Sequence, residues 1–419
     1  MTAEYGALKV ITLRLAWRNL WRHKRRTWLT ASAIAFITVL MVFLITLQLG
    51  SYDLMVDSSL RIFSAQMQVQ REGYLDKPRI RKIIPDAVAL AERLRADPAL
   101  RGVAISTRAQ AFALASSGTR SYGVQVVGAE PEHEPDVSTI PRLMKSGRYL
   151  AGRDAQEAVL GAPLAKNLNI QAGDDLTLLG SAMDGSMAAT IVPVVGIFES
   201  GMRDLDRVLV EMPLGTFQEL FAMGQGAHAI ALLAPDLARL PQMHREVVRL
   251  LPATPELVVL DWDRLIPGLK QIIEADWTID WFIYVALILV VTLSILNTFI
   301  MSVLERTHEF GIMLALGATP LRVGTLVFAE TALLALIGLG IGIGIGFGIA
   351  AWLSVHGFTY PGLEEFMGQY GLPALIYPKL SAKAILIGPA VILGFILVAA
   401  LYPAFRIRKL QPVEAIHVV

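Results

Sequence analysis

The chain has 419 residues, of which 54% are hydrophobic and 17% are charged, and its mean hydropathy is +0.53. A soluble protein carries about a quarter charged residues, so this composition indicates a membrane protein. The formal net charge of +1 argues against nucleic-acid binding, and the absence of cysteine excludes disulfides, cysteine-ligated metal sites and thiol catalysis.

Residues 1–27 predict a cytoplasmic amphipathic helix. Within residues 12–26, four large apolar side chains fall on one helical face and four arginines on the other: Leu13, Trp17, Leu20 and Trp21 against Arg14, Arg18, Arg22 and Arg25. This pattern suits a helix that lies in the inner membrane interface. The segment also serves as a basic flank that fixes topology.

Four apolar runs are long enough to cross a membrane, which takes about 20 residues. They are residues 28–49, 281–304, 321–353 and 384–402. The first run is too long for the core of a cleaved signal peptide, so we expect it to remain as a span. Lysine and arginine gather before the first run and after the fourth, which predicts cytoplasmic termini, including the tail 403–419. Residues 305–320 then lie inside the cell, and residues 50–280 and 354–383 lie outside.

Residues 50–280 read as one α+β domain. Helices are predicted at residues 85–98, 160–170, 213–222 and 236–252, the last interrupted near Pro241, and at 263–280, which should continue into the second span. Strands are predicted at residues 102–115, 121–129, 174–180, 188–198 and 227–234. The fold class expected is four transmembrane helices with a large α+β extracytoplasmic domain inserted between the first and second.

This domain offers no convincing catalytic or metal-binding constellation. His133 and His228 have no partners at metal-ligand spacing, and the acidic stretch 130–136 predicts an exposed loop. We therefore expect a module that binds or docks a partner, with no catalytic residue, cofactor site or metal site in this chain.

The third apolar run contains 338-GLGIGIGIGFG-348. An isolated strand cannot satisfy its backbone in lipid, so the run is predicted to be helical, and no lysine follows that would make it a phosphate-binding loop. On a helix, Gly338, Gly342 and Gly346 share one face, and Gly340, Gly344 and Gly348 an adjacent one. Such faces allow close helix packing, either against the chain's own spans or against a partner permease.

Glu330 lies about nine residues into this third run. A carboxylate within a span is a functional candidate by default. Because Glu330 falls near the cytoplasmic side, a structural hydrogen bond is favoured over a proton or substrate role.

The stretch 305-ERTHEFGIMLALGATPLRV-323 resembles the signature of the FtsX-like permease family, which runs R-T-x-E-x-G-I and then A-x-G-A after the second span. The matching residues are Arg306, Thr307, Glu309, Gly311, Ile312, Ala315, Gly317 and Ala318. The segment 402-YPAFRIRKLQPVEAIHV-418 resembles the other recurrent element of that family, and the layout of spans agrees.

The resemblance implies the permease subunit of a type VII ABC transporter, similar to the MacB, LolC and LolE proteins. In that family the short helix after the second span is the coupling helix, which sits in a groove of the ATPase. Glu305, Arg306 and Glu309 would then form a charged rim on its surface, and Phe310, Met313 and Leu314 would be apolar anchors. Gly311 belongs to the same helix, and Gly317 would end it.

The partners implied are a separate ATPase that binds ATP and Mg²⁺, a second permease copy in a homodimer or heterodimer, and a periplasmic adaptor or chaperone. The ATPase is expected in trans because only about 27 residues precede the first span and no Walker A sequence occurs. The favoured function is extraction of a lipoprotein or lipid-anchored substrate from the inner membrane by mechanotransmission. The alternatives are efflux of a hydrophobic drug or peptide through an adaptor, and regulation of a cell-wall hydrolase without transport.

Overall fold

The computed structural model describes residues 2–252, 256–359, 361–363 and 375–406. The chain divides into two compact units. The helical unit contains residues 1–52, 274–359 and 375–419, and the sheet unit contains residues 53–273 and 360–374. Each unit is described by itself below.

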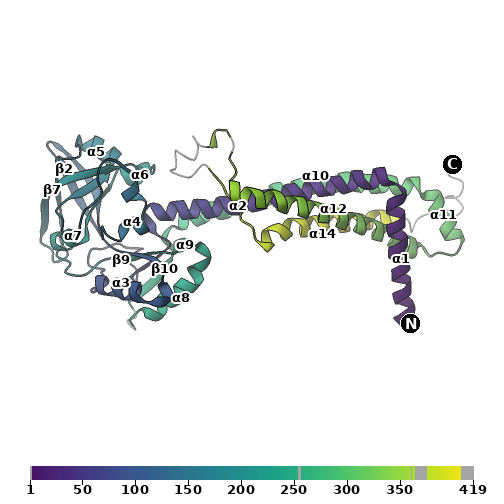
Figure 1. Cartoon of the computed structure of the whole chain (residues 1–419), viewed down its shortest axis with the longest axis horizontal. Coiled ribbons are helices and arrows are strands. Elements are labelled where there is room, and N and C mark those ends of the chain that lie inside the picture. Colours follow the sequence, from purple (N-terminus) through teal and green to yellow (C-terminus); the bar gives the residue numbers. More distant parts are fainter. Residues whose placement is uncertain (1, 253–255, 360, 364–374, 407–419) are drawn as a thin grey trace. The chain divides into compact units, whose positions relative to one another are not determined.

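Four long helices of the helical unit lie side by side (Figure 1). They are α2 (Lys24–Ser59), α10 (Pro267–Glu305), α12 (Pro320–His356) and α14 (Ala382–Arg406), and all four are long and apolar enough to cross a membrane. Each contains one of the predicted spans, so the four predicted spans are confirmed as apolar helices. The short α11 (Thr307–Ala315) joins α10 to α12, and α1 (Thr2–Arg22) runs across the end of the bundle against α12.

The core of the helical unit is built by apolar side chains from all four long helices. Ile34 and Met41 of α2, Ile288 of α10, Leu339 of α12 and Ile392 of α14 are each 5% exposed or less. Outward positions such as Phe36 and Phe282 are apolar and exposed, at 70% and 75%. A helix that is apolar on every side suits a lipid environment, where the outward side chains meet hydrocarbon.

The sheet unit is built on ten strands in one sheet. The strands are β1 (Met67–Arg71), β2 (Ala104–Ser117), β3 (Arg120–Ala129), β4 (Met144–Gly147), β5 (Ala158–Gly161), β6 (Asp175–Ser181), β7 (Met187–Phe198), β8 (Leu209–Pro213), β9 (Ala229–Leu233) and β10 (Leu257–Asp261). Six of them close a ring, because β2, β3, β8, β5, β7 and β6 pair in that order and β6 pairs back to β2. A three-stranded arm of β9, β1 and β10 extends the sheet from β2.

Short helices cover the sheet. They are α3 (Ala87–Ala96), α4 (Glu134–Val137), α5 (Ala162–Leu168), α6 (Arg203–Asp206), α7 (Leu214–Leu220), α8 (Leu240–Leu250) and α9 (Trp262–Leu265). A π-helical turn, Leu60–Ser64, follows α2 directly and leads into β1. Phe217 of α7 and the adjoining Phe221 fill the main core, with ring centroids 4.5 Å apart.

The five predicted strands correspond to β2, β3, β6, β7 and β9. The predicted helices at 85–98, 160–170 and 213–222 correspond to α3, α5 and α7. In the 236–252 prediction, a 3₁₀ turn Leu237–Arg239 precedes α8, so Pro241 lies in the first turn of α8 and does not interrupt it. The predicted helix 263–280 is broken at Ile266 and is continuous with the second span only from Pro267.

The prediction that residues 130–136 form an exposed loop is wrong. Glu134 begins α4 and is fully buried, and Glu130 is 7% exposed. Glu134 accepts hydrogen bonds from the buried Arg108 and from Ser106 at 2.6 Å, and Glu130 pairs with Arg95. Buried carboxylates persist where charged partners satisfy them, and here those partners come from β2 and α3.

Candidate functional site

The predicted coupling segment forms a short helix with a defined start and stop. Arg306 is the N-cap residue of α11, although its side chain makes no capping hydrogen bond. At its end, the backbone N–H of Gly317 donates to the Leu314 carbonyl, and that of Ala318 to the Met313 carbonyl, each at 3.0 Å. These are the two bonds of a Schellman motif, and Gly317 takes the left-handed φ of +94° that the motif needs. Thr319 is extended and Pro320 opens α12, so α11 ends at Ala315, two residues before Gly317.

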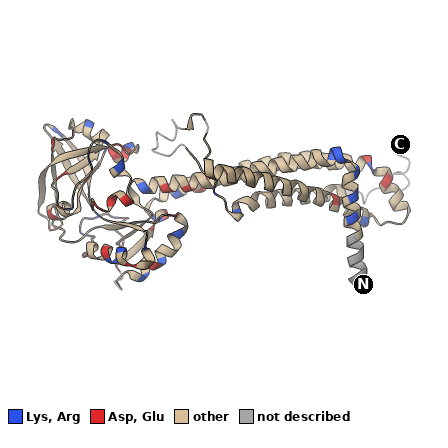
Figure 2. Ribbon diagram, in the orientation of Figure 1, with Lys and Arg blue, Asp and Glu red and all other residues tan. Residues whose placement is uncertain are grey.

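A network of charged and polar side chains fixes α11 to α1 and α12. Arg306 donates to Glu330 of α12 at 2.8 Å and to Glu309 at 3.1 Å, and Asn19 of α1 donates to the other oxygen of Glu330. Arg22 of α1 pairs with Glu309 at 3.0 Å. Figure 2 shows blue segments of α1 beside red segments of α11 and α12 at this end of the helical unit. Three helices, α1, α11 and α12, therefore share one set of charges, and α2 joins the set through Arg26.

Arg26 of α2 completes the network. It donates to the Thr298 carbonyl at 2.8 Å and pairs with Glu305 at 3.4 Å.

Burial lowers the pKa of Arg306, but the neighbouring carboxylates of Glu330 and Glu309 outweigh that effect, so the pKa of Arg306 is raised. Burial raises the pKa of Glu309, and the opposing hydrogen bond from Arg306 more than compensates, so the pKa lies below its usual value. Both groups are therefore ionised at neutral pH, and Glu330 accepts hydrogen bonds as a structural carboxylate would.

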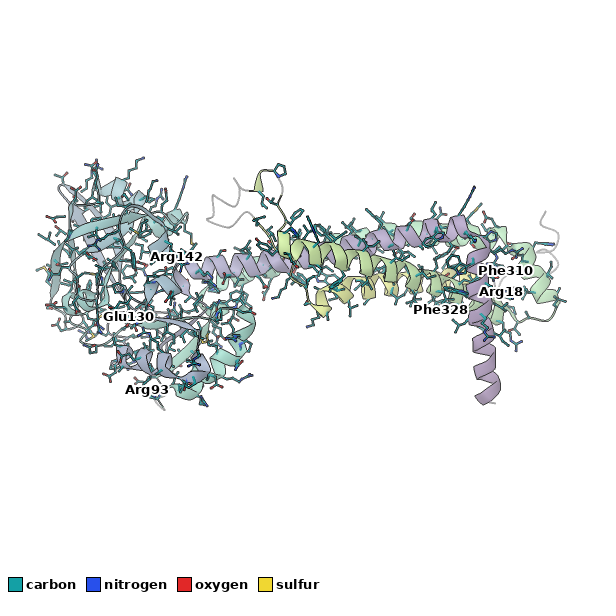
Figure 3. All side chains as sticks on the ribbon, in the orientation of Figure 1. Arg18, Arg93, Glu130, Arg142, Phe310 and Phe328 are labelled. Carbon is teal, nitrogen blue, oxygen red and sulfur yellow. The ribbon has the colours of Figure 1, made fainter. Side chains whose placement is uncertain are left out.

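Phe310 anchors α11 from the inside. Its side chain is 1% exposed and packs with Val303 of α10 and with Val323 and Val327 of α12, and the Arg306 guanidinium lies 5.1 Å from its ring centroid. Figure 3 labels Phe310 at this end of the helical unit. The prediction that Phe310 is an exposed apolar anchor is wrong, because the chain's own helices cover it. The prediction that Arg306 belongs to an exposed rim is wrong for the same reason, since its side chain is only 14% exposed.

A different set of side chains forms the free edge of α11. Leu316 is 83% exposed and Ile312 is 44% exposed, and His308 and Glu305 are also exposed. Met313 and Leu314 are half-buried against the inner cluster, and Gly311 is buried. His308, Ile312 and Leu316 are spaced four residues apart, so they line up along one side of the helix. The four-residue spacing could have identified Ile312 and Leu316 as a contact surface from the sequence, but the sequence analysis selected other residues as anchors.

The glycines of α12 separate into a packed face and an open face. A Cβ atom built on Gly338 would lie 2.7 Å from the Ile34 Cβ, one on Gly342 would lie 2.5 Å from the Thr38 Cβ, and one on Gly346 would lie 3.0 Å from the Val42 Cβ. Because these three glycines have no Cβ atom, α2 packs closely against this face of α12. A Cβ on Gly340, Gly344 or Gly348 meets no atom within 4 Å. Of the two packing partners considered from the sequence, the chain's own span occupies the first face.

His228 of the sheet unit has the surroundings of a structural residue. His228 is fully buried, accepts a hydrogen bond from the Gln110 backbone at 2.9 Å, pairs with the Ile80 carbonyl at 3.1 Å and stacks on Tyr74. Its burial lowers its pKa to about 4, which keeps the ring neutral. Among the described residues, no group of three or more potential metal ligands occurs.

Two known protein-family models match this chain. A family model described as the MacB-like periplasmic core domain matches residues 27–250, which is just over half of the chain, and one described as the FtsX-like permease C-terminal matches residues 281–412. The chain belongs to the FtsX-like permease family with a MacB-like periplasmic core domain. Its second motif, at 402–418, lies almost entirely outside the described residues.

Relatives of this FtsX-like permease include two proteins described as lipoprotein-releasing system transmembrane proteins. LolC of Xylella fastidiosa is 25% identical over 79% of this chain and 80% of its own length, and LolE of Haemophilus influenzae is 26% identical over 78% and 80%. Among solved structures, the periplasmic region of MacB from Actinobacillus actinomycetemcomitans covers 51% of this chain at 17% identity and a TM-score of 0.37. The extracellular domain of YknZ covers 47% at 12% identity and a TM-score of 0.35.

Proposed function

We propose that this permease is the transmembrane subunit of an ABC transporter, paired with a second permease copy and driven by a separate ATPase that binds ATP and Mg²⁺. Its termini and α11 face the cytoplasm, and the sheet unit faces the periplasm. The assignment to the permease family supports the transporter role. The arrangement of lysine and arginine along the chain supports the orientation.

One observation carries the proposed docking role of α11. Its inner side is held by Phe310 and by the Arg306 network, whereas its outer edge presents Ile312 and Leu316 to solvent. The exposed apolar side chains Ile312 and Leu316, on the same side of the helix as the exposed His308, fit a small apolar contact inside a polar rim. A helix held this firmly passes any displacement to the helices it touches, which are α1, α10 and α12.

The mode of action we propose is mechanotransmission. ATP binding would close the ATPase dimer and draw the two α11 helices together, and α2 and α10 would carry the movement to the periplasmic domain. Both helices contain residues of both units, since α2 reaches Ser59 and α10 begins at Pro267. An unbroken helix is a stiff connector, because every internal backbone group is hydrogen-bonded along its axis.

The proposed substrate is a lipoprotein or another lipid-anchored molecule taken from the outer leaflet of the inner membrane. The match to LolC and LolE proteins over more than three quarters of the chain supports this class. Efflux of a hydrophobic drug or peptide with an adaptor protein is the second candidate, favoured by the MacB-like domain.

The test is affinity capture of the full-length chain from solubilised membranes, with identification of the proteins and lipidated species that co-purify. Wild type should bring down an ATPase and a lipoprotein. Leu316→Glu should lose most of the ATPase, because it places a charge in the apolar contact. Met187→Glu is the matched control, since Met187 is 77% exposed and lies in the sheet unit. Equal ATPase recovery by the Leu316 variant and the control would reject the docking role, and recovery of an adaptor without lipoproteins would favour efflux.

A further inference from the structure

The sheet unit contains a cavity of about 1020 Å³ that the coupling role does not use. One wall is formed by the last turns of α2 and the π-helical turn, through Asp57, Ser58 and Arg61. The opposite walls are formed by α5 and by the turn that carries α6, and Thr139 lies on a further side. The cavity therefore lies at the point where the chain passes from the first apolar helix into the sheet.

The cavity holds more positive than negative side chains. Two cations that line it are neutralised locally, because Arg61 pairs with Asp57 and Lys145 with Glu199, each at 2.6 Å. The remaining carboxylate, Asp206, is buried. It accepts hydrogen bonds from the backbone N–H and the hydroxyl of the nearby Ser200.

Three cations that line the cavity have no carboxylate partner. Lys166, Arg203 and Arg207 are exposed, and no ion pair joins them to any residue in the described ranges. Arginine has a planar set of donors that matches two oxygens of a phosphate at once, and lysine adds a point charge. Three such groups around one cavity give the chemistry of an anion site.

The turn that presents the two arginines is fixed in place. Gly161, at the junction of β5 and α5, lies so close to α6 that a Cβ on it would be 2.1 Å from the Asp206 carbonyl oxygen. The Asp206 hydrogen bonds to Ser200 close the other side of the turn. The backbone that carries Arg203 and Arg207 is therefore held beside the cavity, which reduces the backbone ordering that a ligand would require.

An unsatisfied hydroxyl gives independent evidence for a missing partner. Thr139 is one of the residues that line the cavity, and its Oγ1 atom is buried and has no hydrogen-bond partner among the described residues. A buried hydroxyl without a partner is costly unless a water molecule or a ligand satisfies it.

We propose that this cavity binds the phosphate-bearing headgroup of an anionic phospholipid, with Lys166, Arg203 and Arg207 on the phosphate and the Thr139 hydroxyl as a further donor. The identity of the ligand as a lipid headgroup rests on the proposed function, in which the periplasmic domain handles molecules drawn from the outer leaflet. A free phosphate ion has the same anionic chemistry, so the test distinguishes the two.

The experiment measures binding to the purified full-length chain in an uncharged detergent, by calorimetry at 50 mM and 300 mM salt. The probes are glycerophosphoglycerol, which is the soluble headgroup, inorganic phosphate, and zwitterionic glycerophosphocholine. We expect glycerophosphoglycerol to bind best, at least tenfold tighter than glycerophosphocholine, and to weaken at high salt because ions screen exposed charges. Arg203→Ala/Arg207→Ala should weaken its binding at least tenfold.

Arg79→Ala/Arg101→Ala is the matched control, because it removes two exposed arginines of the same unit away from the cavity. Wild-type binding of inorganic phosphate as tight as that of the headgroup would overturn the lipid assignment. An undiminished affinity in the Arg203/Arg207 variant, or an equal loss in the control, would overturn the site itself. ATPase capture on the same preparations reports separately on the proposed function, so the two can fail independently.

Discussion

At the scale of single residues, Arg306 is the centre of the coupling segment. It reaches Glu330 at 2.8 Å and Glu309 at 3.1 Å and lies over the Phe310 ring, and its side chain is only 14% exposed. A charge this enclosed stabilises a structure only through its partners. Removing the arginine leaves the Glu330 carboxylate without its cation.

The first prediction is that Arg306→Ala destabilises the protein. The expected loss is about 2 kcal/mol, because the pair is only partly buried and a fully buried pair costs more to break. It should appear as a thermal midpoint lowered by several degrees in detergent. The double variant Arg306→Ala/Glu330→Ala should lose less than the sum of the two single variants. Strict additivity would mean that the two residues do not interact.

Glu211 is a second residue whose surroundings make a measurable prediction. It is fully buried, Tyr149 donates to it at 3.0 Å, and its other oxygen has no partner among the described residues. Burial, reinforced by the nearby Glu134 carboxylate and opposed by Arg108, raises its pKa to about 8. The folded state therefore holds a proton that the unfolded state releases above its ordinary pKa of about 4.3.

The pH prediction follows from that difference. Because the folded state binds more protons than the unfolded state between about pH 4.3 and 8, Glu211 makes stability fall as pH rises through this range. His228, with its pKa lowered to about 4, acts in the opposite direction below its ordinary pKa of about 6.5. Between pH 6.5 and 8 the wild-type thermal midpoint should therefore fall more steeply than that of Glu211→Gln. Parallel profiles would contradict the raised pKa.

At the scale of elements, the packed and the open glycine faces of α12 allow the same substitution, glycine to alanine, to be compared in two environments. Alanine at Gly342 would place a Cβ 2.5 Å from the Thr38 Cβ, whereas alanine at Gly344 meets open space. In a helix, alanine is favoured over glycine by about 0.5–1 kcal/mol when no clash opposes it. The sign of the effect should therefore differ between two positions only two residues apart.

We predict that Gly342→Ala lowers the thermal midpoint, with a cost of about 1–3 kcal/mol from overpacking against α2. Gly344→Ala should leave the midpoint unchanged or raise it slightly. The measurement is thermal unfolding of both variants in the same detergent. Equal effects at the two positions would show that α2 does not pack on Gly342.

The elements also show which patterns can be recognised in a sequence. The strands with alternating or β-branched segments, such as β2 and β7, were predicted, but β5 and β8 were not. All residues of β5 and β8 are buried, so they carry no alternation, and both are only four or five residues long. A short, fully buried strand offers only a brief apolar run as a signal; β9, which is as short and as buried, was predicted from such a run, whereas β8 is interrupted by Glu211 and ends at Pro213.

The coupling segment was predictable in position but not in orientation. Gly317, Thr319 and Pro320 mark its end through backbone chemistry that is local. Phe310, Ile312 and Leu316 are all large and apolar, and contacts with Val303 and Val327 decide that Phe310 is the buried one. The same reason explains the acidic stretch 130–136, since its partners Arg95 and Arg108 are 35 and 26 residues away.

At the scale of the whole molecule, the proposed orientation can be tested directly, because the chain has no cysteine. Leu316 and Met187 are 83% and 77% exposed and belong to different units. A cysteine at either position should therefore be the only thiol and should be accessible to a reagent on its own side of the membrane.

We predict that Met187→Cys reacts with a membrane-impermeant maleimide once the outer membrane has been opened and the inner membrane is intact. Leu316→Cys should react only after the inner membrane is broken. Labelling is read from the mass shift of the purified chain. Reaction of Leu316→Cys in cells with an intact inner membrane would reverse the proposed topology.

The central claim is that the exposed edge of α11 contacts an ATPase. The most direct measurement places a photo-crosslinking amino acid at Leu316 in native membranes, with separate chains carrying it at Phe310 and Met187 as controls. The account predicts a crosslinked product that contains an ATPase from Leu316, whereas the buried Phe310 should crosslink within its own chain and Met187 should give no ATPase product. Failure of Leu316 to capture an ATPase, or its capture from Met187, would contradict the account.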